Sequence, residues 1–137
     1  MLELKKDFQK WHDKKARIDT LGKRPFFHER EVWFCHLGAN VGFKQDGIGN
    51  DFLRPVIVFR KFSSKIFWAV PLTKVDKETN EKAAKYYFTF FLKERGKNCA
   101  ILSQIRLVDA RRLSYLIGEI SEKDFVDLTK KLKGLLP

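Results

Sequence analysis

The sequence of 137 residues has few cysteines and no long apolar segment. Cys35 and Cys99 are too few for a disulfide scaffold, and both stand in apolar, strand-like surroundings. We therefore expect two buried free thiols in a reducing compartment, which predicts a cytoplasmic protein. No apolar run approaches the ~18 residues of a membrane-spanning helix, and the first residues lack the apolar centre of a signal peptide. No membrane partner is expected.

The motifs of common metal and cofactor sites are also missing. The three histidines are scattered along the chain and the two cysteines are far apart, so no zinc site is expected. The glycine-rich stretch 38–49 leads into a strand-like run, whereas the phosphate-binding loop GxxxxGK[ST] leads into a helix. No GxSxG nucleophile motif occurs. The sequence thus predicts that the protein uses neither metal nor cofactor.

Acidic residues are scarce relative to basic ones. The chain has 28 Lys and Arg against 17 Asp and Glu, a net charge of +11, and the excess is spread along its length. Such a charge attracts polyanions, namely nucleic acid, acidic proteins or an anionic surface. The alternative is a basic surface that serves solubility alone.

Hydrophobic residues make up 44% of the chain and include 13 Phe, which predicts a folded core. Residues 1–29 form an N-terminal unit of amphipathic helix and linker. Its apolar residues recur with helical spacing at Leu4, Phe8, Trp11 and Ile18. The helix is expected to end near Gly22 and to dock on the core, a second subunit or a partner, and we expect Phe26 and Phe27 to tuck against the core.

Residues 30–137 form the second predicted unit, a mainly β domain with a C-terminal helix. Ser121 with Asp124 predicts the start of that helix. Short strands with few parallel crossovers indicate a small, curled, mostly antiparallel barrel. The predicted strands are Glu31–Leu37, Arg54–Phe59, Lys65–Thr73, Lys85–Lys93, Cys99–Val108 and Leu116–Ile120.

Two of these strands predict a hairpin that carries the candidate chemistry. If its turn is centred between Ser63 and Ser64, paired residue numbers sum to 127, so Arg54 faces Thr73. A guanidinium grips the non-bridging oxygens of a phosphodiester, and a hydroxyl can fix one of them. Pro71 limits the second strand to an edge or an irregular end.

Other polar side chains could line the same groove. In the strand Cys99–Val108, alternation places Gln104 and Arg106 on one face, and the alternative is a solvated sheet face. Lys44 and Gln45 belong to the glycine-rich loop. His36 could act as a base near the loop, although a lone histidine in a strand is more often structural.

Five segments, in order, resemble the MazF/PemK toxins, the RNA-cleaving toxins of type II toxin–antitoxin systems. The resemblance as a whole extends from about residue 30 to about residue 135. The segments are Glu31–Leu37, Val41–Gly47, Arg54–Val58, Val70–Thr73 and Leu102–Leu113. The resemblance implies an SH3-like barrel, usually a homodimer, that cleaves single-stranded RNA in a sequence-specific way without metal. The products would carry 2′,3′-cyclic phosphate and 5′-hydroxyl ends, and an acidic antitoxin would cover the RNA groove.

The resemblance also implies residue roles. Arg54 and Thr73 would be catalytic, and Gln45, Gln104 and Arg106 would shape the groove beside Lys44. Asp46 and His36 are the candidate bases, and positioning of the 2′-hydroxyl without a strong base is the alternative. The chain departs from the family pattern at Phe43, Lys44 and Ser103. These departures favour an alternative function, in which a catalytically inactive barrel binds RNA or a protein target.

Overall fold

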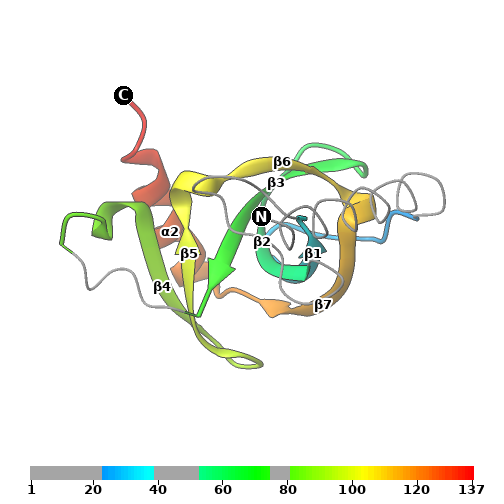
Figure 1. Cartoon of the computed structure of the whole chain (residues 1–137), viewed down its shortest axis with the longest axis horizontal. Coiled ribbons are helices and arrows are strands. Elements are labelled where there is room, and N and C mark those ends of the chain that lie inside the picture. Colours follow the sequence, from blue (N-terminus) through cyan, green and yellow to red (C-terminus); the bar gives the residue numbers. More distant parts are fainter. Residues whose placement is uncertain (1–22, 39–52, 75–80) are drawn as a thin grey trace, which may run out of the picture.

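The computed structural model describes residues 23–38, 53–74 and 81–137. The predicted N-terminal helix and most of the glycine-rich loop lie outside these residues. The strands pair antiparallel in the order β4-β5-β3-β2-β1-β7, with β6 also paired to β3, and the sheet curls around its own interior (Figure 1). The strands are β1 (Glu31–His36), β2 (Leu53–Lys61), β3 (Ile66–Thr73), β4 (Tyr87–Leu92), β5 (Gly96–Ile101), β6 (Arg106–Asp109) and β7 (Leu113–Glu119).

Three short 3-10 helices and one α-helix complete the described part. They are η1 (Ala84–Tyr86), η2 (Leu102–Gln104), η3 (Ala110–Arg112) and α2 (Glu122–Lys133). The predicted mainly antiparallel β fold with a C-terminal helix is confirmed. Among the described residues the sheet does not close, because β4 and β7 stand at its two ends. The closed barrel therefore stays a prediction.

The β2–β3 hairpin has the predicted register along most of its length. Val56 pairs with Pro71 and Val58 with Ala69, as a constant sum of 127 requires. Beyond Val58 the register shifts by one, so that Arg60 pairs with Trp68. This irregularity near the turn adds one unpaired residue to β2, and the register at the other end of the hairpin stays as predicted.

The position of Pro71 rules out the edge strand, which was one of the two alternatives that we expected for β3. β3 lies inside the sheet: β2 pairs along one side, while β6 and β5 share the other. On that second side Ala69 pairs with Arg106, and Leu72 pairs with Ala100. Pro71 lies between these two ladders, where its missing N–H interrupts neither.

The predicted single strand Cys99–Val108 was wrong. The chain ends β5 at Ile101, makes the 3-10 turn η2, and starts β6 at Arg106. In one continuous antiparallel strand paired with β3, the two residue numbers of every pair would have the same sum. The sum is 172 for Leu72–Ala100 and 175 for Ala69–Arg106, so the turn η2 accommodates three extra residues. Strand periodicity did not reveal this turn, because Leu102, Ser103 and Gln104 also fit the alternation of apolar and polar residues in a strand.

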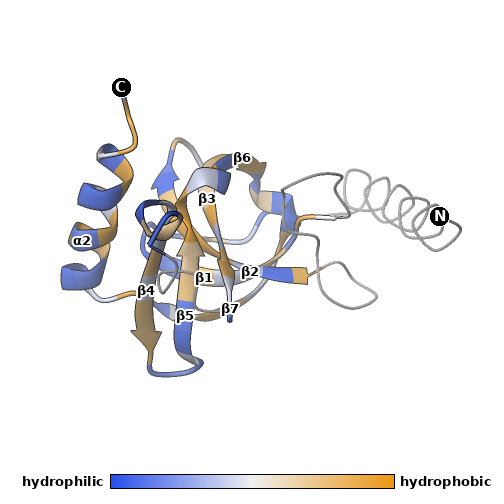
Figure 2. Cartoon of the chain, turned by 60° about the vertical axis from the view of Figure 1, so that its left-hand side comes forward, coloured by the Kyte–Doolittle hydropathy of each residue, from blue (hydrophilic) through white to orange (hydrophobic). Residues whose placement is uncertain are grey.

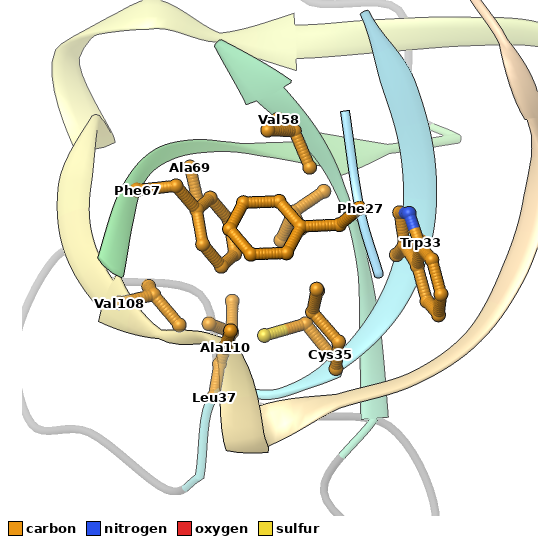
Figure 3. Close-up of a cluster of buried hydrophobic side chains, with 11 residues drawn as sticks. Phe27, Trp33, Cys35, Leu37, Val58, Phe67, Ala69, Val108 and Ala110 are labelled. Atoms are coloured by element: carbon orange, nitrogen blue, oxygen red, sulfur yellow. The ribbon is translucent and has the colours of Figure 1, made fainter. Parts of the chain in front are cut away.

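A first core cluster fills the interior of the curled sheet (Figure 3). Phe27 lies at its centre, fully buried, with its ring centroid 5.1 Å from that of Phe67. Phe26 is 94% exposed, so only one of the two phenylalanines packs against the core as expected. The remaining members are Trp33, Cys35, Leu37, Val56, Val58, Ala69, Val108, Ala110 and Leu113.

A second core cluster lies between the sheet and α2. Leu128 of α2 is fully buried, and Phe125, Leu132 and Leu135 pack against the cluster, which confirms the predicted apolar stripe. Ser121 Oγ accepts the backbone N–H of Asp124 at 3.1 Å and so caps the helix as predicted. In Figure 2, hydrophilic and hydrophobic residues of α2 lie on different sides of the helix, as expected for a helix with one buried face.

In the described part of the chain, no helix is long and apolar enough to cross a membrane. Within the same residues, no three His, Cys, Asp or Glu side chains lie close enough together to hold a metal ion.

Candidate functional site

Arg54 lies near the start of β2, directly opposite Cys35 of β1. Directly opposed residues of an antiparallel pair share a face of the sheet. Cys35 is fully buried in the first core cluster, whereas Arg54 is partly exposed. The Arg54 side chain therefore shares the interior face of the curled sheet, at the place where that interior meets solvent.

Thr73 is the last residue of β3, and it lies opposite Cys99 of β5. Its exposed fraction is 8%, so only a small part of the side chain reaches solvent. The β2–β3 ladder ends at Val56–Pro71, two residues before the predicted pair. The same register continued by two residues would place Arg54 opposite Thr73, and this pairing stays a prediction.

Gln104 and Arg106 occupy different elements and not one strand face. Gln104 ends η2, while Arg106 begins β6 opposite Ala69. Arg106 is half-buried. In the described part of the chain, neither a hydrogen bond nor an ion pair of its guanidinium is found.

Arg112 is a member of this region that sequence reasoning missed. Burial and then the neighbouring Arg112 guanidinium lower the pKa of Arg106. The Cys35 thiol is near both: burial raises its pKa to about 12, although Arg112 and Arg106 act in the opposite direction. Two guanidinia therefore lie near one buried thiol at this end of the interior, and their positive charge favours an anion there. The adjacent arginines at 111 and 112 were the available signal, but the predicted strands did not include Arg112, so its position could not be predicted.

Asp109 explains why Arg111 does not contribute to that charge. Its carboxylate accepts hydrogen bonds from the Arg111 side chain and from Arg24, both at 3.0 Å at Oδ2. Burial alone would raise the pKa of Asp109, but the bonds from Arg111 and Arg24 bring it down to about 2. Arg111 is thus neutralised, whereas Arg112 lies beside Arg106.

The candidate bases and loop residues are placed as follows. His36 is the last residue of β1, opposite Leu53 and partly exposed. Strand alternation puts it on the opposite face of β1 from Cys35, and hence from Arg54. Lys44, Gln45 and Asp46 lie outside the described residues, and so does Phe43.

An apolar cavity of about 450 Å³ is lined by residues of β2, β3, η2 and α2. Ser103, the third departure from the family pattern, is one of its few polar lining residues. The apolar lining comes from Phe59, Trp68, Leu102, Ile105, Leu132, Leu135 and Leu136. None of the predicted catalytic or substrate-binding residues lines it.

Solved structures with the same fold are MazF proteins and an endoribonuclease. MazF from Deinococcus radiodurans superposes with a TM-score of 0.62 at 17% identity, over 82% of this chain and 96% of that one. A MazE–MazF structure from the same organism gives 0.58 at 14% identity, over 82% and 95%. An endoribonuclease from a mycobacterial species, solved with its cognate antitoxin, gives 0.58 at 13% identity, over 82% and 99%. At such identities the likeness shows the fold alone.

By sequence, the chain matches a protein family but no single curated protein. No curated protein sequence matches the chain. A family model described as "PemK-like, MazF-like toxin of type II toxin-antitoxin system" matches residues 28–136, which is most of the chain and all of its described sheet. The chain therefore belongs to the family of PemK-like, MazF-like toxins of type II toxin–antitoxin systems.

Proposed function

We propose that this toxin is a metal-independent endoribonuclease that cleaves single-stranded messenger RNA at specific sequences in the cytoplasm. Membership of the toxin family implies an endoribonuclease, and the net charge of +11 suits a polyanionic substrate. The catalytic unit would be residues 30–137, closed into an SH3-like barrel and paired as a homodimer. Residues 1–29 would form a helical extension of that unit.

In the proposed reaction, the 2′-hydroxyl oxygen attacks the adjacent phosphorus. The new O2′–P bond forms as the P–O5′ bond breaks, which leaves a 2′,3′-cyclic phosphate and a 5′-hydroxyl. Arg54 would stabilise negative charge on the phosphorane-like transition state, and Thr73 would hold one phosphoryl oxygen. The 2′-hydroxyl proton would pass to Asp46, to His36 or to solvent, and the leaving O5′ would take up a proton.

The observation that carries this proposal is the register of the β2–β3 hairpin. It holds the predicted sum through Val56–Pro71, the last pair before Arg54 and Thr73. The electropositive pair of Arg106 and Arg112 adds an anion-attracting field at the same face, around Cys35. Gln104, Gln45 and Lys44 would extend the groove along the RNA.

We further propose an acidic antitoxin as the protein partner. Two of the similar structures contain an antitoxin or MazE. For this chain, an acidic disordered segment would neutralise the basic groove and block RNA at the same time. Co-expression of a small acidic protein encoded beside the toxin gene should therefore relieve any growth arrest that the toxin causes.

The decisive experiment incubates the purified protein with mixed-sequence single-stranded RNA in the presence of a metal chelator. We expect cleavage at a limited set of sites. The fragments should carry 5′-hydroxyl ends that a polynucleotide kinase can phosphorylate, and 3′ ends that cannot be ligated until the cyclic phosphate is removed. Cleavage that needs added metal would overturn the mechanism. Tight RNA binding without any cleavage would instead favour the inactive RNA-binding barrel, to which Phe43, Lys44 and Ser103 point.

A further inference from the structure

A cluster of two aromatic rings and two cations lies beside the strand ends that carry Arg54 and Thr73. We name it the aromatic platform and define it as Phe34 of β1, Tyr115 of β7, Arg95 of the β4–β5 turn and Lys74. The Phe34 and Tyr115 ring centroids are 4.8 Å apart. The Arg95 guanidinium lies over the Phe34 ring, 5.3 Å from its centroid. Tyr115 is 51% exposed, so one ring of the platform is open to a ligand.

The platform is held in place from below. Arg95 Nε donates to Asn98 Oδ1 at 3.0 Å, and Asn98 Nδ2 donates to the Gly96 carbonyl at 2.8 Å. Asn98 is almost fully buried, and Gly96 has the positive φ of 81° that this tight turn requires. Such a network fixes the Arg95 side chain before any ligand arrives, which reduces the entropy cost of binding.

The two cations of the platform are kept close together despite their like charge. Lys74 Nζ donates to the carbonyl oxygens of Arg95 and Lys97. Burial and then the Arg95 charge lower the pKa of Lys74, and burial lowers the pKa of Arg95. Glu94, the acid in the same turn, lies against β7, and its carboxylate fills the space where a Cβ of Gly118 would stand. An anion that binds Lys74 and Arg95 would relieve their repulsion.

The platform adjoins the predicted catalytic pair through the strands. Phe34 lies opposite Pro55 on β2, and Phe34 and Pro55 immediately adjoin Cys35 and Arg54, which also lie opposite one another. Lys74 directly follows Thr73 in the chain. The platform and the predicted catalytic residues are thus one residue apart along β1, β2 and β3. Strand alternation puts them on opposite faces of the sheet, so the two groups adjoin only around the strand ends.

We propose that the RNA passes over these strand ends and that the aromatic platform binds the nucleotide next to the scissile phosphate, an inference that rests on the proposed function. The base of that nucleotide stacks on the exposed Tyr115 ring, which Phe34 supports, and its phosphate contacts Lys74 and Arg95. Stacking on aromatic side chains needs unpaired bases and tolerates any base, because every base has a π-face. The platform therefore selects single strands, while the sequence preference comes from elsewhere in the groove.

The test measures binding of a fluorescein-labelled, mixed-sequence single-stranded RNA whose 2′-O-methyl groups prevent cleavage. Tyr115→Leu should weaken binding about tenfold or more, since one base–aromatic stack contributes ~1–3 kcal/mol. Tyr115→Phe keeps the ring and should restore most of the affinity. Arg95→Gln should weaken binding and also reduce the salt slope by about 0.7, because one phosphate contact is lost.

The chain offers a matched control in Tyr86. This tyrosine is 37% exposed and carries a cation, Lys85 Nζ, 5.0 Å from its ring centroid, but it belongs to η1, outside the platform. Tyr86→Leu should leave the affinity within about twofold of the wild-type value. Thermal melting of all variants checks that the sheet remains folded.

The outcomes separate this inference from the proposed function. If the wild-type protein binds and cleaves RNA while Tyr115→Leu and Tyr86→Leu bind equally well, the platform is overturned and the endoribonuclease stands. Equal binding by the two tyrosine variants, together with weaker RNA binding by Arg95→Gln, would indicate that Lys74 and Arg95 bind an anion alone, such as an acidic peptide. This result would also overturn the base-stacking role. If the wild-type protein neither binds nor cleaves RNA, both the proposed function and the platform fail.

Discussion

Arg54 of β2 and Cys35 of β1 are direct cross-strand partners, so the predicted catalytic guanidinium shares a sheet face with a fully buried thiol. Thr73 has a similar neighbour, because it lies opposite the buried Cys99. The candidate chemistry thus stands at the boundary between core and solvent. A rigid core on one side limits the movement of both side chains, which favours fixed positions around a phosphate.

Substitution of this pair should separate chemistry from folding. Arg54→Ala and Thr73→Ala should each reduce the cleavage rate ~10²–10³-fold, because each removes a donor from the transition state. Arg54→Lys should recover little activity, since an ammonium cannot make the bidentate contact. Thr73→Ser retains the hydroxyl in this nearly buried position and serves as the control. The measurement is single-turnover cleavage of a labelled RNA.

The double variant tests whether the two residues act on one phosphate. Groups that act as a unit are not additive, so Arg54→Ala with Thr73→Ala should be no slower than the worse single variant. Additive losses, or full activity in either single variant, would place the chemistry elsewhere. His36 and Asp46 would then be the next residues to replace.

RNA binding should depend steeply on salt. We expect log Kd to change with log salt concentration by about 0.7 per phosphate contacted on single strands. Duplex RNA of equal charge should bind more weakly, because its bases cannot reach the aromatic side chains. Fluorescence anisotropy over a range of potassium chloride concentrations measures both effects. Equal affinity for duplex and single strand would contradict a groove that recognises unpaired bases.

The two adjacent phenylalanines should differ sharply in their effect on stability. Phe27 is fully buried, packs on Phe67 and has Lys61 Nζ 4.5 Å from its ring centroid. Phe27→Ala should reduce the free energy of unfolding by about 3–5 kcal/mol. Phe26→Ala, at a 94% exposed position, should change it by less than about 0.5 kcal/mol. Urea unfolding followed by tryptophan fluorescence compares them, and equal losses would mean that Phe27 is not a core residue.

Asp109 should make stability depend on pH in the acid range. Its folded pKa of about 2 lies below the ordinary 3.8, so the fold favours the charged carboxylate. The stabilisation is therefore present above about pH 4 and is lost as the pH falls towards 2. Asp109→Asn should cost about 1–2 kcal/mol at neutral pH, since it weakens the bonds from Arg111 and Arg24.

The difference between wild type and Asp109→Asn should shrink when urea unfolding is repeated near the folded pKa. The exposed Asp127 of α2 offers a control, and Asp127→Asn should leave the stability nearly unchanged at both pH values. A cost for Asp109→Asn that is constant with pH would show that the carboxylate charge is not what stabilises this corner.

The two thiols should be inert while the protein is folded. Both cysteines are buried and free, and burial raises the pKa of Cys35 to about 12. At mildly alkaline pH almost none of the Cys35 thiol is ionised, and the thiolate is the reactive form. Iodoacetamide should therefore label neither cysteine in buffer and both in urea, as mass spectrometry would report. Rapid labelling of Cys35 in the folded protein would contradict its burial.

Local sequence signals were sufficient for the elements that rest on local rules. The cap at Ser121, the apolar stripe of α2 and the register at Val56–Pro71 follow from hydrogen-bonding groups and from periods of 3.6 and two residues. The two free, buried cysteines likewise follow from their number and apolar neighbours. The cationic character follows from a simple count of charges, without any knowledge of the fold.

Only the tertiary structure decided the features that depend on which strands become neighbours. β6 and β5 pair in succession with the same side of β3, and this arrangement requires the turn η2 between them. The turn separates Gln104 from Arg106, and the pairing on both sides of β3 places Pro71 inside the sheet. The curl of the sheet buries Phe27 and leaves Phe26 exposed. It also brings Arg112 near Arg106, and Arg95 over Phe34. These residues are far apart in the sequence or carry no periodic signal, and long-range packing alone sets the distances between them.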